Sequence, residues 1–85
     1  MKKLIYTLKA DNRTFEMFAK AVNYGDYTLL IKQDKNEYGI PMLFTGTQVD
    51  EFKRLLDKVK SLNGYSYKVI CMIITGCARY SLYVR

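Results

Sequence analysis

The chain has 85 residues, of which 49% are hydrophobic, and its 14 Lys and Arg against 8 Asp and Glu give a formal net charge of +6. This length predicts a single domain, residues 1–85. No apolar run approaches the roughly 20 residues that a membrane-spanning helix needs. The chain has no histidine, which is the commonest general base and metal ligand. We therefore expect an intracellular, cytoplasmic protein that is not an enzyme, holds no metal or cofactor, and favours an acidic partner.

The first half of the chain carries three strand signals and one helix signal. Residues 2–9 alternate apolar and polar side chains, which is the period of a strand. Residues 14–22 place Phe15, Phe18 and Val22 at i, i+3 and i+7, which predicts an amphipathic helix. Residues 27–33 and 38–45 are rich in strand-forming side chains and are joined by a turn. Pro41 predicts a sheet edge or a bulge in the later strand, because proline has no amide hydrogen to donate.

The second half predicts one helix and a terminal hairpin. Val49, Phe52 and Leu56 form an apolar stripe within residues 47–62, where Thr47 and Asp50 resemble a capping box. Asn63 and Gly64 then end this helix. Residues 67–75 and 78–85 read as two strands that are joined by a tight turn at Thr75 and Gly76.

The predicted order of elements is β-α-β-β-α-β-β. Its first six elements resemble the order of ferredoxin-like domains, and a seventh element adds a strand at the C-terminus. The fold prediction is therefore an α+β protein, with a mainly antiparallel five-stranded sheet and two helices packed on one face. The RNA-recognition module shares the six-element order. However, the segment "NEYGIPMLF" lacks that module's third-strand motif, so we do not assign the chain to that family.

The two cysteines invite a redox, metal or catalytic interpretation. In the predicted hairpin, Cys71 and Cys77 point to opposite faces and are offset by about 10 Å along the strands. This is too far for a disulfide. Two cysteines without a histidine do not make an ordinary zinc site, and a nucleophilic cysteine usually works with a histidine base. We expect two reduced thiols without a catalytic role.

The same hairpin gathers basic, aromatic and apolar side chains on one face, and lysines of other predicted strands extend it. If the helices cover one side of the sheet, this surface occupies the other. The candidate binding residues are Lys3, Lys9, Lys32, Lys68, Met72, Ile74, Arg79, Tyr83 and Arg85.

Two functions are compatible with such a surface. Met, Arg and aromatic side chains are enriched in protein interfaces, which favours a protein-binding or inhibitor module with an acidic or nucleic-acid-associated protein partner. Small phage-encoded inhibitors of host or defence factors offer an analogy. An exposed last strand also predicts a homodimer through the C-terminal hairpin. The alternative is an RNA-binding or single-stranded-DNA-binding domain, in which lysines contact phosphates and tyrosines stack on bases.

Overall fold

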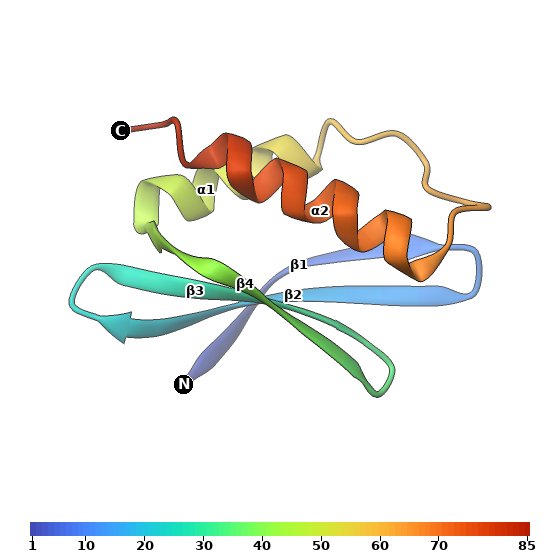
Figure 1. Ribbon diagram of the computed structural model, residues 1–85, viewed down its shortest axis with the longest axis horizontal. Coiled ribbons are helices and arrows are strands. Elements are labelled where there is room, and N and C mark those ends of the chain that lie inside the picture. Colours follow the sequence, from blue (N-terminus) through green and yellow to red (C-terminus); the bar gives the residue numbers. More distant parts are fainter.

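The computed structural model describes all 85 residues and shows a four-stranded antiparallel sheet followed by two helices (Figure 1). The strands lie in the sheet in chain order: β1 (Lys2–Ala10), β2 (Arg13–Asn23), β3 (Asp26–Gln33) and β4 (Asn36–Thr45). Helices α1 (Gly46–Leu56) and α2 (Tyr67–Ser81) both lie on one side of this sheet. We call the other side the open face. Neither helix is long and apolar enough to cross a membrane.

The α+β class is as predicted, but the ferredoxin-like order is wrong. The sheet is a meander of four strands rather than a five-stranded sheet with interleaved helices, and both helices follow the last strand. Two segments cause the difference. The predicted helix at residues 14–22 is part of β2, and the predicted hairpin at residues 67–85 is mostly α2.

Strand β2 contains the residues whose spacing predicted a helix. Phe15, Met17 and Ala19 are buried at a period of two, on the side that faces the helices. Phe18 points to the open face, so it does not share a stripe with Phe15. β2 pairs with both β1 and β3, and these two ladders satisfy its backbone groups. Long-range pairing therefore overrides the local helical spacing.

Helix α2 replaces the predicted terminal hairpin. Its buried positions recur three and four residues apart, at Ile70, Cys71, Ile74, Ala78 and Ser81. The Ser66 Oγ caps its first turn by accepting a hydrogen bond from the Val69 amide, at 3.3 Å. The expected turn at Thr75 and Gly76 lies inside the helix, where the Thr75 hydroxyl donates to the Cys71 carbonyl at 2.7 Å. The β-branched residues of this segment favoured a strand, but the burial pattern of the folded chain is helical.

Helix α1 confirms the predicted second helix in position but not in its cap. The Thr45 Oγ1 accepts from the Gln48 amide at 3.2 Å, and the Gln48 Oε1 accepts from the Thr45 amide at 2.9 Å. This is a complete capping box, so the pair is Thr45 and Gln48 rather than Thr47 and Asp50. The helix ends at Leu56, six residues before the predicted end at residue 62.

Strand β4 is the sheet edge that Pro41 predicted. Leu29 pairs with Ile40 and Tyr27 pairs with Phe44, so residues 41–43 of β4 lie opposite the single residue Thr28. The ladder is thus regular before Pro41 and bulged after it. Proline fits here because an irregular edge does not need its missing amide hydrogen.

The core between sheet and helices is one cluster of sixteen buried hydrophobic residues. Phe15, Phe44 and Phe52 are its largest fully buried side chains. Phe15 also stacks on the Tyr67 ring at the start of α2, with 5.8 Å between ring centres. Burial of these rings accounts for much of the apolar area that holds the helices to the sheet.

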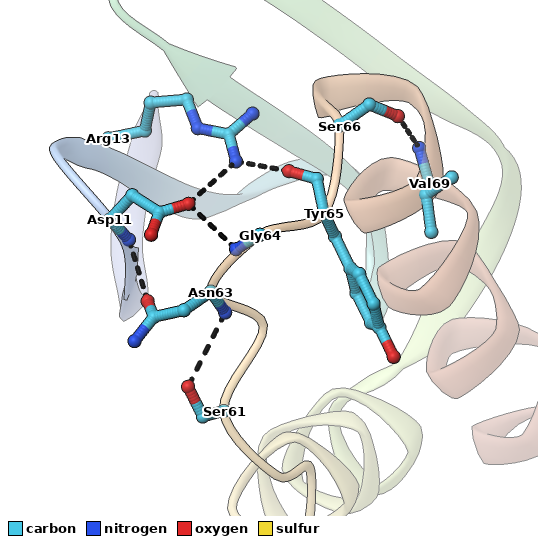
Figure 2. Close-up of polar contacts among 8 residues, drawn as sticks. All are labelled: Asp11, Arg13, Ser61, Asn63, Gly64, Tyr65, Ser66 and Val69. Carbon is cyan, nitrogen blue, oxygen red and sulfur yellow. Dashed lines mark hydrogen bonds and ion pairs between the residues drawn. The ribbon is translucent and has the colours of Figure 1, made fainter.

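Polar contacts fix both ends of α2 against the rest of the fold. At its start, the β1–β2 turn holds the linker between the helices (Figure 2). The Asp11 amide donates to Asn63 Oδ1 at 2.7 Å, the Gly64 amide donates to Asp11 Oδ2 at 2.8 Å, and Arg13 donates to the Tyr65 carbonyl. At its end, the Gln48 Nε2 donates to the carbonyls of Leu82 and Val84. These contacts orient the outer side of α2.

Candidate functional site

The structure brings only part of the predicted binding surface together. Lys68, Met72 and Arg79 lie on the exposed side of α2 and line one groove. The prediction placed them together by strand parity, whereas positions 68, 72 and 79 share a helix face through the spacings i, i+4 and i+11. The three residues thus lie together as predicted, but because they share a helix face and not because they share a strand face.

The other predicted residues lie elsewhere. Ile74 is fully buried in the core, so its assignment to a binding face is wrong. Lys3 pairs with the buried Ala19 and so lies on the helix side of the sheet, whereas Lys9 and Lys32 lie on the open face. Tyr83 and Arg85 follow the end of α2, where Tyr83 is 81% exposed.

The groove, which we call the α2 groove, has a volume of about 690 Å³ and lies between α2 and the β4 edge. Seven of its lining residues belong to α2 and repeat every four positions, so they form one side of the helix. Tyr38 supplies the β4 side. The lining residues are Tyr38, Tyr67, Lys68, Cys71, Met72, Thr75, Gly76 and Arg79.

The α2 groove is apolar along its length and open to solvent. Met72 is 64% exposed and Tyr38 is 39% exposed, although both carry large apolar surfaces. A Cβ atom added to Gly76 would meet no atom within 4 Å, so no side chain fills the space above this turn of the helix. The α2 groove therefore presents exposed apolar surface between α2 and Tyr38 of the β4 edge.

Two cations border the α2 groove without an acidic partner. The ion pairs of the structure join Lys2 to Glu37, Arg13 to Asp11 and Arg54 to Glu51. Lys68 and Arg79 therefore have no carboxylate within ion-pair distance. They are eleven residues apart, which corresponds to about 16 Å along a helix. The groove thus presents uncompensated positive charge near both ends of its α2 side.

Neither thiol of α2 is arranged for chemistry. Cys71 is buried, and burial raises the pKa of both the Cys71 and the Cys77 thiol above its ordinary value. Both thiols are therefore protonated at neutral pH, whereas the thiolate is the nucleophile and the metal ligand. Six helical residues separate the two cysteines by about 9 Å, and both are free. The helix, and not the expected strand parity, keeps them apart.

The open face differs from the basic, tyrosine-bearing surface that we expected. The strand tyrosines Tyr6, Tyr27 and Tyr38 pair with Met17, Phe44 and Ile31, which are buried under the helices. Directly paired residues share a face, so these tyrosines lie on the helix side. The open face therefore carries no strand tyrosine on which a nucleic-acid base could stack.

Two of the four lysines of the open face, Lys2 and Lys32, have acidic neighbours, whereas Lys9 and Lys20 do not. Lys32 pairs with Glu16 on one side and Glu37 on the other. Lys2 lies 5.1 Å from the centre of the Phe18 ring and forms an ion pair with Glu37 at 3.5 Å. This pair joins the two edge strands across the face and covers Phe18. The open face is thus mixed in charge and partly closed.

Sequence reasoning missed five of the eight residues that line the α2 groove. Tyr38, Tyr67, Cys71, Thr75 and Gly76 were assigned to other strands, faces or turns. The available signal was the repeat of four in Tyr67, Cys71 and Thr75 and in Lys68, Met72 and Gly76. That repeat places them on one side of a helix, but the β-branched residues between them concealed it.

The comparisons with known proteins add no relative. No protein-family model matches the chain, and no curated protein or solved structure gives a significant match. No group of three or more His, Cys, Asp or Glu side chains is arranged to hold a metal ion. The α2 groove is therefore the feature from which a function is inferred.

Proposed function

We propose that this chain is a non-enzymatic protein-binding module that docks an acidic segment of another protein in the α2 groove. The observation that carries this proposal is the combination of an exposed apolar groove with two cations, Lys68 and Arg79, that have no acidic partner. Apolar contact supplies affinity, and charge complementarity supplies orientation and speed of association.

The groove residues favour binding over chemistry. None of the residues that line the groove is His, Asp or Glu, and its thiol, Cys71, is buried and protonated. A module of this kind acts on its partner by occupying a surface, as an inhibitor or an adaptor does. We therefore propose inhibition or recruitment, rather than modification, as the consequence of binding.

A second copy of the chain is a poorer occupant than an acidic partner. The homodimer predicted from the sequence used a C-terminal hairpin that is in fact helix α2. If two copies packed antiparallel through the α2 groove, Lys68 of each would approach Arg79 of the other. Parallel packing would bring identical cations together. Like charges at an interface are unfavourable, so the groove is better matched to a carboxylate-bearing segment.

A nucleic acid is also a poorer occupant. The α2 groove has two cations about 16 Å apart with apolar residues between them, whereas a phosphate track needs closely repeated cations. The open face, which was the expected site for bases, has acidic residues beside Lys2 and Lys32 and no strand tyrosine.

Selection from a displayed library of random twelve-residue peptides tests the proposal. The wild-type chain should enrich peptides that combine Asp or Glu with apolar residues. A charge-reversed groove variant, Lys68→Glu with Arg79→Glu, should bind these peptides at least about tenfold more weakly, because two attractive contacts become repulsive. The matched control is Lys9→Glu with Lys20→Glu, which changes the net charge equally on the open face. Peptides that bind both variants equally, or a failure to enrich any peptide, would contradict the proposal.

A labelled single-stranded oligonucleotide provides the competing ligand. We expect only weak binding that falls with salt and is reduced to a similar degree by both double variants, as for non-specific attraction to a basic protein. Tight oligonucleotide binding that the open-face variant alone abolishes would replace the protein-binding proposal with the nucleic-acid alternative.

A further inference from the structure

The edge of β4 lies directly beside the α2 groove and is free to pair. β4 is the last strand of the sheet, so its outer side has no neighbouring strand. In an antiparallel sheet, every second residue of an edge strand directs its N–H and C=O groups away from the sheet. Tyr38 lies within this edge and lines the groove. A chain bound in the groove would therefore meet unpaired backbone groups.

The two edges of the sheet are protected to different degrees. The β1 edge carries Lys2, Lys3 and Lys9 and an irregularity between Leu4 and Tyr6. Lysines and bulges are the usual means by which proteins prevent an edge from pairing with another chain. β4 contains no lysine or arginine, and its pairing with β3 is regular over residues 36–40. Only the bulge after Pro41 interrupts it.

The dimensions of the groove and of the regular edge agree. Five residues of extended chain span about 17 Å. This matches both the regular part of β4, residues 36–40, and the distance of about 16 Å along α2 from Lys68 to Arg79. In the view of Figure 1, α2 crosses the sheet in the same general direction as β4. A strand on the β4 edge would thus run along the exposed side of α2.

We infer that the acidic segment binds in extended form as a fifth strand on β4, with every second side chain directed into the α2 groove. This inference rests on the proposed function and specifies its binding mode. Backbone hydrogen bonds to residues 36–40 hold the segment, Met72 and Tyr38 contact its apolar side chains, and Lys68 and Arg79 select carboxylates near its ends. Strand addition of this kind uses the main chain for affinity and alternate side chains for specificity.

A hexapeptide with Glu, Val and Glu on one face of an extended chain, acetyl-Glu-Thr-Val-Thr-Glu-Thr-amide, is a suitable probe for the full-length chain. Two isomers serve as controls, one N-methylated at its first, third and fifth residues and the other at its second, fourth and sixth. In strand addition only one of these sets of amides faces β4. We therefore expect one isomer to bind at least about tenfold more weakly than the parent, because two or three backbone hydrogen bonds are lost. The other isomer should bind like the parent.

Titration of the 15N-labelled chain with the peptide, followed by NMR, locates the bound peptide and measures its affinity. The inference predicts shifts in the amides of residues 36–40 together with those of α2 around Met72. If the two isomers bind equally, or if the shifts are confined to α2, strand addition is overturned while docking in the groove stands. If the hexapeptide fails but library-selected peptides bind in a groove-dependent way, strand addition is again overturned alone. If neither the hexapeptide nor any library peptide binds, both strand addition and the proposed function are overturned.

Discussion

Asp11 combines two roles that are unusual for a turn residue. Its backbone is left-handed, with φ at 57°, and its carboxylate accepts from the Gly64 amide and lies 3.6 Å from Arg13. Asp34, in the β3–β4 turn, has nearly the same backbone, with φ at 56°, but its side chain has no hydrogen bond. A comparison of substitutions at Asp11 and Asp34 therefore separates the effect of the left-handed backbone, which both share, from the effect of the contacts to the linker, which only Asp11 makes.

Substitution of Asp11 by Ala should destabilise the fold more than substitution of Asp34 by Ala. Both changes put alanine, which tolerates positive φ less well than aspartate does, at a left-handed position, and this shared cost is at most roughly 1 kcal/mol. Asp11→Ala also removes the contacts to Gly64 and Arg13, which adds about 1 kcal/mol. Urea denaturation measures both values. Equal losses for the two variants would show that the carboxylate of Asp11 does not hold the linker.

Tyr6 makes the fold sensitive to alkaline pH. Burial raises the pKa of Tyr6, and its hydrogen bond to Asp57 Oδ1, at 2.7 Å, raises it further. A raised pKa means that the folded state favours the neutral phenol more than the unfolded state does. The stabilisation is therefore fully present below the ordinary tyrosine pKa of about 10 and is lost as the pH rises through the higher folded value.

The Tyr6→Phe variant should lose stability less steeply than the wild type above about pH 10. Denaturant midpoints measured across this range provide the test. Tyr67 has a pKa raised by burial as well, so some alkaline loss remains in the variant. An unchanged slope in Tyr6→Phe would mean that the Tyr6–Asp57 contact does not contribute.

Among the helices and strands, a segment was predicted correctly where its local sequence pattern agrees with its long-range pairing and packing. Helix α1 was predictable because its apolar stripe is also its buried side, although the predicted capping pair was wrong. In β2, Phe15 and Phe18 lie three residues apart, which suggested a helix, although they face opposite sides of the sheet. This segment is a strand because it pairs with both β1 and β3. In α2, β-branched residues suggested strands, and the helix is set by packing of Ile70 and Ile74 against the sheet.

Replacement of Gly76 by Ala distinguishes the helix from the hairpin that was expected at this site. Gly76 lies within α2, without a positive φ, and an added Cβ meets nothing within 4 Å. Alanine should therefore stabilise the fold by about 0.5–1 kcal/mol, since glycine is the poorer helix former. Thermal or urea denaturation measures this change. A destabilisation by Gly76→Ala would contradict the helical assignment of this turn.

For the molecule as a whole, the candidate site was only partly visible in the sequence. Lys68 and Met72 were recognised because residues four positions apart share a face in both a strand and a helix, and Arg79 was added through the predicted turn. Tyr38 was not connected with them, because its position beside α2 depends on a contact between segments about thirty residues apart. The ion pair of Lys2 with Glu37 and the position of Lys32 between two glutamates likewise arise from strand register, which the sequence alone did not predict correctly.

The distribution of charge over the folded molecule supports the α2 groove as the binding site for an acidic segment. The net charge of +6 does not by itself distinguish the groove from the open face. The structure distinguishes them by their surroundings. Lys68 and Arg79 border the apolar α2 groove without an ion pair, whereas on the open face Lys2 is paired with Glu37 and Lys32 lies between Glu16 and Glu37 in the sheet. Lys9 and Lys20 are also without an ion pair but do not border the groove. An acidic ligand should therefore respond to the position of a charge reversal and not only to the total charge.

The most direct measurement compares the affinity of one library-selected acidic peptide for the two charge-matched double variants. We expect the Lys68→Glu with Arg79→Glu variant to bind it at least about tenfold more weakly than the Lys9→Glu with Lys20→Glu variant does. Circular dichroism of both variants provides the control for folding. Equal affinities for the two folded variants would contradict the claim that the α2 groove is the binding site.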